Sequence, residues 1–320
     1  MRQNAIGETG VKVTELGFGA SALGSMPDTY GYAVDESRAR ETLHAIFESE
    51  VNWIDTARAY GFGESEARIG RAIAERGGLP QGFVISTKLD RDVETGRFDA
   101  DRARRSLEES LTALGLDRVD ILHLHDPEHA RDEAEIAGPG GAIEALLRMK
   151  EEGLTRAVGL AMGEVGLFAR LLEGHPFDCL ITHNRFTLVN RNAEALIEAA
   201  HARGIAVLNA APFAGGVLAK GSAEMPRLTY QEASGEALAP VREVERLCAR
   251  HSVAPGAAAL RFSMREPRVA ATIAGVSRPE RVRQTLAWAH AAIPEELWHD
   301  LAALPVSTGD PEAERAYRPG

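Results

Sequence analysis

The sequence predicts an α/β fold, a (β/α)8 TIM barrel with an N-terminal β-hairpin and long rim loops, formed as a single domain over residues 1–320. Two observations predict it. Short apolar runs alternate with helix-like stretches along the whole chain, a pattern typical of parallel strands joined by helices. Three successive runs also end in ionisable residues, which in a barrel would meet at the carboxyl-terminal rim.

The first half of the chain is expected to supply four strand–helix units. The run VKVTELGFG (11–19) predicts a hairpin leading into the first strand. The next three strands are expected in the runs VNWID, FVISTK and VDILHLH. Helices are expected after the four strands, over residues 36–50, 64–75, 99–115 and 142–152. Gly77 and Gly115 are the expected stops of two of these helices, and Asp99 opens one.

The second half continues the alternation. Strands are expected in TRAVGL, DCLIT, IAVLNA and VAATIAG. The helices expected after them cover residues 165–172, 192–203, 240–251 and 279–291. Two connections, 126–141 and 212–239, exceed the roughly 12 to 15 residues usual for a structureless loop and are candidate lids over a rim pocket. The tail, 294–320, is assigned only a C-terminal arm.

Composition limits the classes of function. A formal net charge of -11 disfavours nucleic acid and anionic membranes as partners, which leaves a small molecule. The two cysteines, Cys179 and Cys248, imply no disulfide framework and favour a reducing compartment. No apolar run approaches the roughly 18 residues of a membrane span, and the start lacks a signal-peptide pattern. We therefore expect a cytoplasmic protein.

Four residues at the ends of consecutive strands form the candidate site: Asp55, Tyr60, Lys88 and His125. A tyrosine can exchange a proton with an oxygen, but its ordinary pKa of about 10 is too high for neutral pH. A neighbouring ammonium favours the phenolate, so Lys88 is expected to lower the pKa of Tyr60 while Asp55 holds the ammonium. His125 would orient an alcohol or carbonyl through a ring nitrogen. An acid/base with an oxygen-polarising partner and no nucleophile suits alcohol–carbonyl interconversion, with the hydride coming from a cofactor.

Several motifs, in order along nearly the whole chain, resemble the aldo-keto reductases. They are LGFG (16–19), IDTARAYG (54–61), STK (86–88), DRVDILHLHDP (117–127), VGL (158–160) and GIAVLNAAPF (204–213). Within that family the similarity points to bacterial aldose 1-dehydrogenases, acting on L-fucose or related D-threo-aldoses, and to pyridoxal 4-dehydrogenase. The resemblance implies a catalytic tetrad of Asp55, Tyr60, Lys88 and His125 on a barrel that binds NAD or NADP.

By the same resemblance, cofactor contacts are expected at strand ends and in the loops that follow them. They are Gly19, Asp55, His183, Asn184, Asn209, Ala210, Pro212, Gly275, Arg278 and Arg281. The chain departs from many relatives in this region. Ala161 and Met162 replace a Ser-Asn pair, and Ala210 replaces a tyrosine that stacks on nicotinamide. Gly275 and Val276 replace the Lys-Ser of many NADP-dependent members, which favours NAD slightly, although the two arginines keep NADP open.

The substrate pocket is predicted from the residue after His125. Many relatives have tryptophan there, whereas Asp126 offers two acceptor oxygens to hydroxyl groups, which favours a polyhydroxylated substrate such as an aldose. Expected substrate contacts are Tyr30, Tyr60, Phe62, His125 and Asp126, with Phe213 and Tyr230 as further walls. We expect a dehydrogenase that works as a monomer or small homo-oligomer and binds no metal.

Other interpretations of the same residues stay open. Asp55 and Lys88 by themselves would also fit a buried structural ion pair. His123 and His125 would suit a metal-dependent barrel hydrolase, which needs two further ligands that the later strand ends do not supply. Pyridoxal oxidation and general aldehyde or ketone reduction are alternative reactions. A cofactor-binding regulatory subunit is the alternative from another class of protein.

Overall fold

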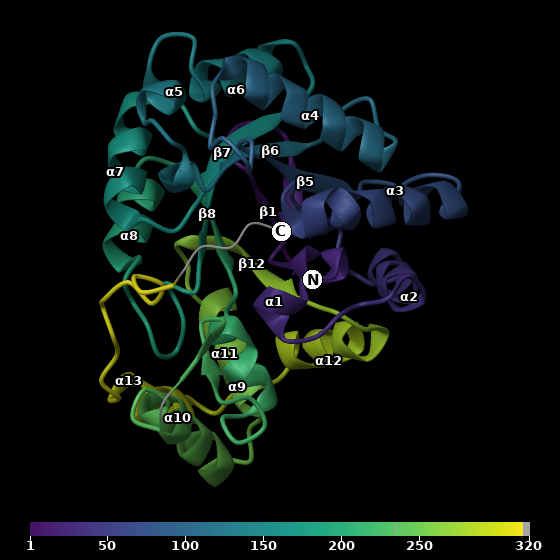
Figure 1. Cartoon of the computed structure of the whole chain (residues 1–320). Helices are drawn as coiled ribbons and strands as arrows, with labels where there is room; N and C mark the ends of the chain where they lie inside the picture. The colour runs from purple at the N-terminus through teal and green to yellow at the C-terminus, as the bar shows by residue number, and fades with distance from the viewer. Residues whose placement is uncertain (234, 316–320) are drawn as a thin grey trace.

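Eight parallel strands close into one barrel, which confirms the predicted fold class (Figure 1). Their order around the barrel is β12-β3-β4-β5-β6-β7-β8-β9. The strands are β3 (Leu16–Gly19), β4 (Trp53–Asp55), β5 (Val84–Leu89), β6 (Ile121–His125), β7 (Ala157–Ala161), β8 (Cys179–His183), β9 (Ala206–Ala210) and β12 (Val269–Gly275). Each corresponds to one predicted run. The register between β12 and β3, which pairs Gly275 with Gly19, closes the barrel between the last strand and the first.

The computed structural model describes residues 1–233 and 235–315. Residue 234, in the second predicted lid, and residues 316–320, at the end of the predicted arm, lie outside the described residues. None of the helices in the described part of the chain has both the length and the apolar character needed to cross a bilayer.

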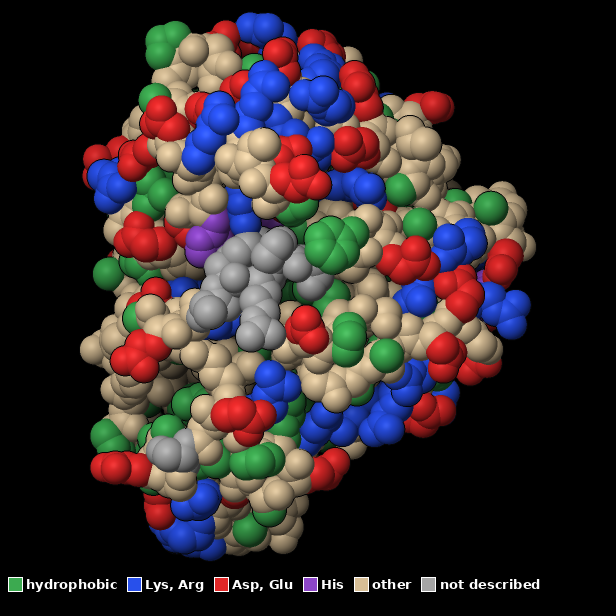
Figure 2. Space-filling view, in the orientation of Figure 1, with side chains coloured by type: hydrophobic (Ala, Val, Ile, Leu, Met, Phe, Trp, Pro, Cys, Tyr) green, Lys and Arg blue, Asp and Glu red, His purple; other side chains and the backbone are tan. Residues whose placement is uncertain are grey.

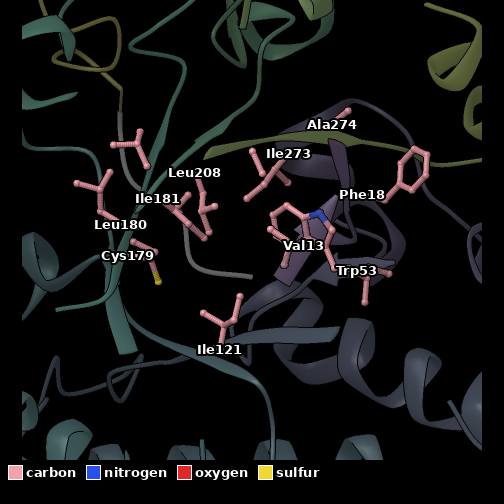
Figure 3. Close-up of a cluster of buried hydrophobic side chains, with 14 of the residues drawn as sticks. Val13, Phe18, Trp53, Ile121, Cys179, Leu180, Ile181, Leu208, Ile273 and Ala274 are labelled. Atoms are coloured by element: carbon pink, nitrogen blue, oxygen red, sulfur yellow. The ribbon is translucent and has the colours of Figure 1, made fainter. Parts of the chain in front are cut away.

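The predicted N-terminal hairpin is present as β1 (Gln3–Ala5) paired antiparallel with β2 (Lys12–Thr14). It lies against the amino-terminal ends of the barrel strands. The indole Nε1 of Trp53, on β4, donates to the carbonyl oxygens of Thr14 and Leu16 at 3.0 Å each. The close-up in Figure 3 shows Val13 of the hairpin beside the Trp53 ring in the buried core. The hairpin therefore closes the end of the barrel opposite the site.

Helices surround the barrel, as Figure 1 shows. The long ones are α2 (Glu36–Phe47), α3 (Glu64–Arg76), α4 (Ala100–Leu114), α6 (Ala142–Glu151), α7 (Val165–Gly174), α8 (Glu194–Ala202), α10 (Ala239–Arg250), α11 (Pro255–Met264), α12 (Pro279–Ala289) and α13 (Glu295–Ala302). The predicted end signals act as expected. Asp99 caps α4 by accepting from the Arg102 backbone N–H, and Gly77 and Gly115 take left-handed conformations just past α3 and α4.

Two of these helices, α11 and α13, were not predicted. Helix α11 begins at Pro255 and carries the small, mostly buried residues of the stretch GAAAL. It therefore lacks the apolar stripe with a 3.6-residue period that is typical of a surface helix. The ring of Trp288, on α12, packs so closely on Gly256 that an added Cβ there would lie 2.4 Å from it. Helix α13 lies inside the tail, which is thus more than an extended arm.

The two predicted lids follow β6 and β9 at the carboxyl-terminal rim. The first contains η3 (Pro127–His129) and α5 (Ala134–Ala137). The second contains η4 (Ala214–Gly216), α9 (Val217–Lys220) and a short antiparallel pair, β10 (Arg227–Leu228) and β11 (Gln231–Glu232). Two further segments, η1 (Ser21–Gly24) and α1 (Pro27–Tyr30), follow β3, and Tyr30 of α1 contacts Tyr230 of the second lid. The second lid, η1 and α1 supply walls of the pocket described below, whereas in the first lid Asp126 alone among the described residues lines it, so its helices η3 and α5 do not cover the pocket.

The two-residue period of a strand decides which side chains face the barrel interior. On β4, Trp53 and Asp55 share the inner face, with the tryptophan in the core layer and the acid one layer higher. The same period places Ser86 below Lys88 on β5 and His123 below His125 on β6. Barrel closure therefore brings these strand-end residues together above an apolar core.

Candidate active site

The ammonium group of Lys88 links three of the four predicted residues. Its Nζ donates to Asp55 Oδ2 at 2.7 Å, to the carbonyl oxygen of Thr56 at 2.6 Å and to the hydroxyl oxygen of Tyr60 at 3.1 Å. The other Asp55 oxygen accepts from the Ser86 hydroxyl at 2.8 Å. Lys88 is 1% exposed and Asp55 4% exposed, so both charges are withdrawn from water and compensate each other.

Two glycines set the position of Tyr60. Gly61, directly after it, has φ 60°, and Gly24 of η1 packs against the same backbone. A Cβ on Gly24 would lie 2.8 Å from the Tyr60 carbonyl carbon, and a Cβ on Gly61 would lie 2.0 Å from the Gly24 oxygen. Because neither residue carries a side chain, the two loops approach closely and direct the Tyr60 hydroxyl toward Lys88.

The pKa of Tyr60 differs from the expectation. Burial raises it well above its ordinary value, and the carboxylate of Asp55 raises it further. The ammonium of Lys88 was expected to lower this pKa, but its charge is balanced by Asp55, so the cost of desolvating a phenolate prevails. Tyr60 is therefore a phenol at neutral pH. Its oxygen accepts a hydrogen bond from the Lys88 ammonium, so its own proton points away from Lys88. The Tyr60 side chain lines the pocket, where it can meet a substrate.

His125 lies beside Tyr60, with ring centroids 5.6 Å apart at an interplanar angle of 87°. Its Nδ1 is 2.6 Å from Oδ1 of Asp90, and because a carboxylate can only accept, Nδ1 must carry a proton. Its Nε2 faces the pocket, 3.8 Å from Asp126 Oδ2. Burial by itself would lower the pKa of His125, but Asp90 and then Asp126 outweigh it and the pKa lies above the ordinary value.

Asp126 takes a left-handed conformation with φ 41° directly after β6, which turns its carboxylate into the pocket. Burial would raise its pKa, but His125, His183 and His129 lower it below the ordinary value, so Asp126 is a carboxylate at neutral pH. It thus presents charged acceptor oxygens within the space above Tyr60 and His125.

One cavity is lined by Asp55, Tyr60, Lys88, His125 and Asp126. It has a volume of about 1640 Å³ including its open mouth, and it extends from the barrel rim to the start of α12. Of the residues that the sequence suggested, the following line it: Gly19, Tyr30, Asp55, Tyr60, Lys88, His125, Asp126, His183, Ala210, Phe213, Tyr230, Gly275 and Arg281. All the strand residues among them lie on the inner faces of their strands. The two-residue period of the strands therefore determines which of these side chains reach the site.

The far end of the cavity is suited to an anionic dinucleotide. Lys220, on α9, and Arg281, on α12, both line it, next to the N-terminus of α12. Burial and then repulsion among Lys220, Arg278 and Arg281 lower the pKa of Lys220 and of Arg281. A phosphate group bound there would relieve this repulsion and face the helix N–H groups. The residues present therefore fit NAD(P), with the glycines Gly19 and Gly275 leaving room along the wall.

Five predicted contacts lie elsewhere. Phe62 is 64% exposed on the outer surface, because its left-handed turn directs it away from the cavity. The side chain of Asn209 points outward between Phe186 and Ser263, as it must when its neighbour Ala210 points inward. Pro212 does not line the cavity, and Arg278 lines an adjoining surface depression instead.

The fifth, Asn184, anchors the C-terminal segment instead of lining the cavity. Its Nδ2 donates to Glu312 Oε1 at 2.7 Å, and the same oxygen is 3.2 Å from His183 Nδ1. Arg315 pairs with the other Glu312 oxygen at 3.0 Å and lines the cavity. Burial would raise the pKa of Glu312, but His183 and then the arginines lower it well below its usual range. The tail thus returns to the rim, which no periodic pattern in the sequence indicated.

Sequence reasoning missed Lys220 and Arg315, which line the cavity. It also missed Asp90, whose carboxylate contacts His125. Asp90 lies one residue beyond β5, two residues after Lys88, and the strand period would have placed it on the same face. His123, packed beneath His125 with 0% exposure, contacts Cys179 Sγ at 3.4 Å and does not reach the cavity. Among the described residues, no three His, Cys, Asp or Glu side chains gather so that they could hold a metal ion.

The chain is similar to known proteins along nearly its whole length. Residues 15–305 match the model of the aldo/keto reductase family. The chain is 29% identical to pyridoxal 4-dehydrogenase of Microbacterium luteolum, over 93% of this chain and 96% of that enzyme. It is 30% identical to L-galactose dehydrogenase of Arabidopsis thaliana (88% and 86%) and 28% identical to D-threo-aldose 1-dehydrogenase of a Pseudomonas species (93% and 96%).

Solved structures share the fold. An aldo-keto reductase from Bacillus halodurans in its holo form superposes with a TM-score of 0.74 at 22% identity, covering 99% of this chain and 100% of that one. A glycerol dehydrogenase from Gluconobacter oxydans gives a TM-score of 0.72 at 19% identity, covering 94% of both chains. At these identities the likeness concerns the barrel and not the substrate.

Proposed function

The chain belongs to the aldo/keto reductase family, and from this membership and the site we propose that it is an aldose 1-dehydrogenase. It is an NAD(P)-dependent oxidoreductase that acts on CH–OH and carbonyl groups. The proposed reaction oxidises the C1 hydroxyl of a cyclic sugar to a lactone. Tyr60, Lys88, Asp55 and His125 are the proposed catalytic residues.

The carboxylate of Asp126 is the observation that supports a sugar. It is ionised, turned into the cavity and 3.8 Å from His125 Nε2, so it can accept hydrogen bonds from hydroxyl groups next to the reacting carbon. An apolar aldehyde offers no donor to this carboxylate and would leave it desolvated and unpaired, which costs affinity. The same wall contains His183, a further polar partner for a substrate with several hydroxyl groups.

The side chains of the site can move the proton in either direction. Tyr60 accepts the N–H of Lys88, so its own O–H is free to point at a substrate oxygen in the cavity. In oxidation, Lys88 stabilises Tyr60 as a phenolate, which takes the hydroxyl proton and becomes a neutral phenol as the hydride leaves the carbon. His125 Nε2 lies on the other side of the same space and hydrogen-bonds the substrate oxygen. Bound NAD(P) supplies the hydride acceptor.

For the cofactor we propose a slight preference for NAD. Lys220 and Arg281 would face the phosphates at the start of α12. Gly275 and Val276 provide neither a cation nor a hydroxyl for a 2'-phosphate, which supports NAD. Arg278 and Arg281 nearby keep NADP as the second possibility.

Pyridoxal oxidation is the second candidate, favoured by the aromatic walls. Tyr30 and Tyr230 meet edge to face with centroids 5.7 Å apart, and Phe213 and Trp288 lie 5.8 Å apart, all four lining the cavity. Such walls suit a flat pyridine ring as well as the apolar face of a sugar. General aldehyde or ketone reduction is the third candidate and would make little use of Asp126.

One panel separates these candidates. L-fucose, L-galactose, D-arabinose, pyridoxal and simple apolar aldehydes are assayed with NAD and NADP, or with their reduced forms, by nicotinamide absorbance. A kcat/KM highest for one of the sugars supports the proposal, and one highest for pyridoxal or for apolar aldehydes would replace it. Single-turnover kinetics test the regulatory-subunit alternative, since a subunit of that kind would bind the cofactor tightly and turn over only slowly.

A further inference from the structure

One buried carboxylate connects the two groups that face the reacting oxygen. Asp90 Oδ1 lies 2.6 Å from His125 Nδ1, while Asp90 Oδ2 accepts the backbone N–H of Ala59 at 2.8 Å. Ala59 immediately precedes Tyr60. The same side chain thus holds the histidine at the end of β6 and the loop that carries the tyrosine.

The backbone of Asp90 is itself fixed from behind by α4. Its N–H donates to the Ser106 hydroxyl at 2.9 Å, and its carbonyl oxygen accepts from Arg102 Nε at 2.9 Å. Asp90 is 5% exposed, so bulk water does not compete for its oxygens. The carboxylate therefore has one location, set by the junction of β5 and α4, and each of its oxygens is used by one side of the site.

We propose that Asp90 is a positioning residue that keeps His125 and Tyr60 in a fixed mutual arrangement by accepting the N–H of the imidazole and the N–H of Ala59. By holding the proton on Nδ1, it leaves Nε2 as the ring nitrogen that meets the substrate. Its negative charge also favours the imidazolium form of His125, so this ring donates to the substrate oxygen over a wider pH range. The role in turnover rests on the proposed function, whereas the effect on His125 does not.

The test uses Asp90→Asn in the full-length protein, with Asp92→Asn as the matched control in the same loop. Asp92 accepts from the backbone and hydroxyl of Thr95, at 2.8 and 2.7 Å, so its substitution removes an equal charge without contacting the site. An asparagine at position 90 can still accept from one partner, but its amide then places a donor against the other N–H. Asp90→Ala is the second variant should that clash prevent folding.

Two measurements are made on each variant. The first is the titration of His125 by NMR, assigned with a His125→Gln variant. The second is the pair of values kcat and KM for the best substrate of the panel. For Asp90→Asn we expect a lower imidazole pKa and a kcat/KM reduced by roughly 10- to 100-fold, mainly in kcat, with neither change in Asp92→Asn.

The outcomes separate the inference from the proposed function. Unchanged titration of His125 in Asp90→Asn would overturn the inference. This holds even if kcat/KM falls, because Asp90 would then act only on the fold. If the parent protein oxidised none of the substrates, the proposed function would fail, while a shifted His125 titration would still support the positioning of the ring by Asp90.

Discussion

The Nζ of Lys88 lies 3.1 Å from the hydroxyl oxygen of Tyr60, although the two residues come from different units of the barrel and are 28 positions apart. The same ammonium is 4.7 Å from the centroid of the Tyr60 ring. This arrangement is what proton exchange with a substrate oxygen requires: a phenol at the cavity wall and a cation able to stabilise its anion.

Removing the phenol oxygen should strongly reduce turnover with little effect on folding. Tyr60→Phe keeps the ring and loses the acid/base group, so we expect kcat to fall roughly 100- to 10,000-fold. NAD(P) affinity, measured by fluorescence titration, and the midpoint of thermal unfolding should stay close to the parent values. A variant that oxidised sugars at the parental rate would show that Tyr60 does not exchange the proton.

Oxidation should be faster at alkaline pH. The pKa of Tyr60 lies above its ordinary value because of burial and Asp55, so the phenolate that accepts the proton becomes more abundant as pH rises. We expect kcat/KM for sugar oxidation to increase through pH 9, and reduction, which uses the phenol, to lack this rise. Profiles recorded in both directions from pH 6 to 10 check this. A plateau of oxidation near neutral pH would mean that Lys88 outweighs burial.

Asp126 should set the preference for sugars. Asparagine tolerates the left-handed conformation of residue 126, so Asp126→Asn changes the charge and little else. Losing charge-assisted hydrogen bonds should reduce kcat/KM for aldoses about 10- to 100-fold, with a much smaller effect on apolar aldehydes. The ratio of the two kcat/KM values is the measurement. Equal losses on both classes of substrate would contradict the role of Asp126 in recognition.

Cofactor preference should respond to a cation at position 275. A Cβ added to Gly275 meets no atom within 4 Å, so Gly275→Lys can be accommodated and places an ammonium near the start of α12. We expect kcat/KM for NADP to rise about tenfold or more from one added ion pair, with NAD nearly unaffected. Gly174→Lys, at an equally open position on the end of α7, is the matched control. A gain for NADP in both variants would indicate only a general charge effect.

Glu66 should make stability depend on pH near neutrality. It is fully buried on α3 and accepts from the Thr87 hydroxyl at 2.6 Å. Its second oxygen has no hydrogen-bond partner among the described residues and lies 3.7 Å from Arg58 Nη1. Burial raises its pKa to about 7. Between its unfolded pKa of 4.5 and 7 the folded state holds the extra proton, so the free energy of unfolding should decrease by about 3 kcal/mol as pH rises across this window.

Urea denaturation at pH 5, 6, 7 and 8 measures this dependence. Glu66→Gln should flatten the curve, whereas Glu108→Gln, an exposed position on α4, should leave it as in the parent. A parental slope in Glu66→Gln would assign the pH dependence to other groups.

Figure 2 shows acidic and basic side chains mixed over one face of the molecule, in keeping with many exposed ion pairs such as Arg104 with Glu152 and Arg148 with Glu144. On that face, acidic side chains lie beside most of the groups of basic side chains. Pairs of this kind contribute little to stability individually, which leaves the barrel core as the main source of stability.

The sequence by itself determined the barrel and the identity of the candidate tetrad. Strand and helix periods are local properties, and once eight strands close in parallel, residues such as Asp55 and Lys88 must meet at one rim. Helix α11 was not predicted because it is buried between α9, α12 and the barrel. A helix that is buried on most sides lacks the amphipathic pattern on which prediction depends.

Only the tertiary structure decided what surrounds the tetrad. Loop conformation and contacts between distant segments place Phe62 on the surface and bring Glu312 to His183. The same holds for Asp90, whose carboxylate contacts His125 from 35 positions away. The pKa of Tyr60 could not be predicted from the sequence either. It depends on burial and on charges that folding brings close to the hydroxyl, and residue spacing reveals neither.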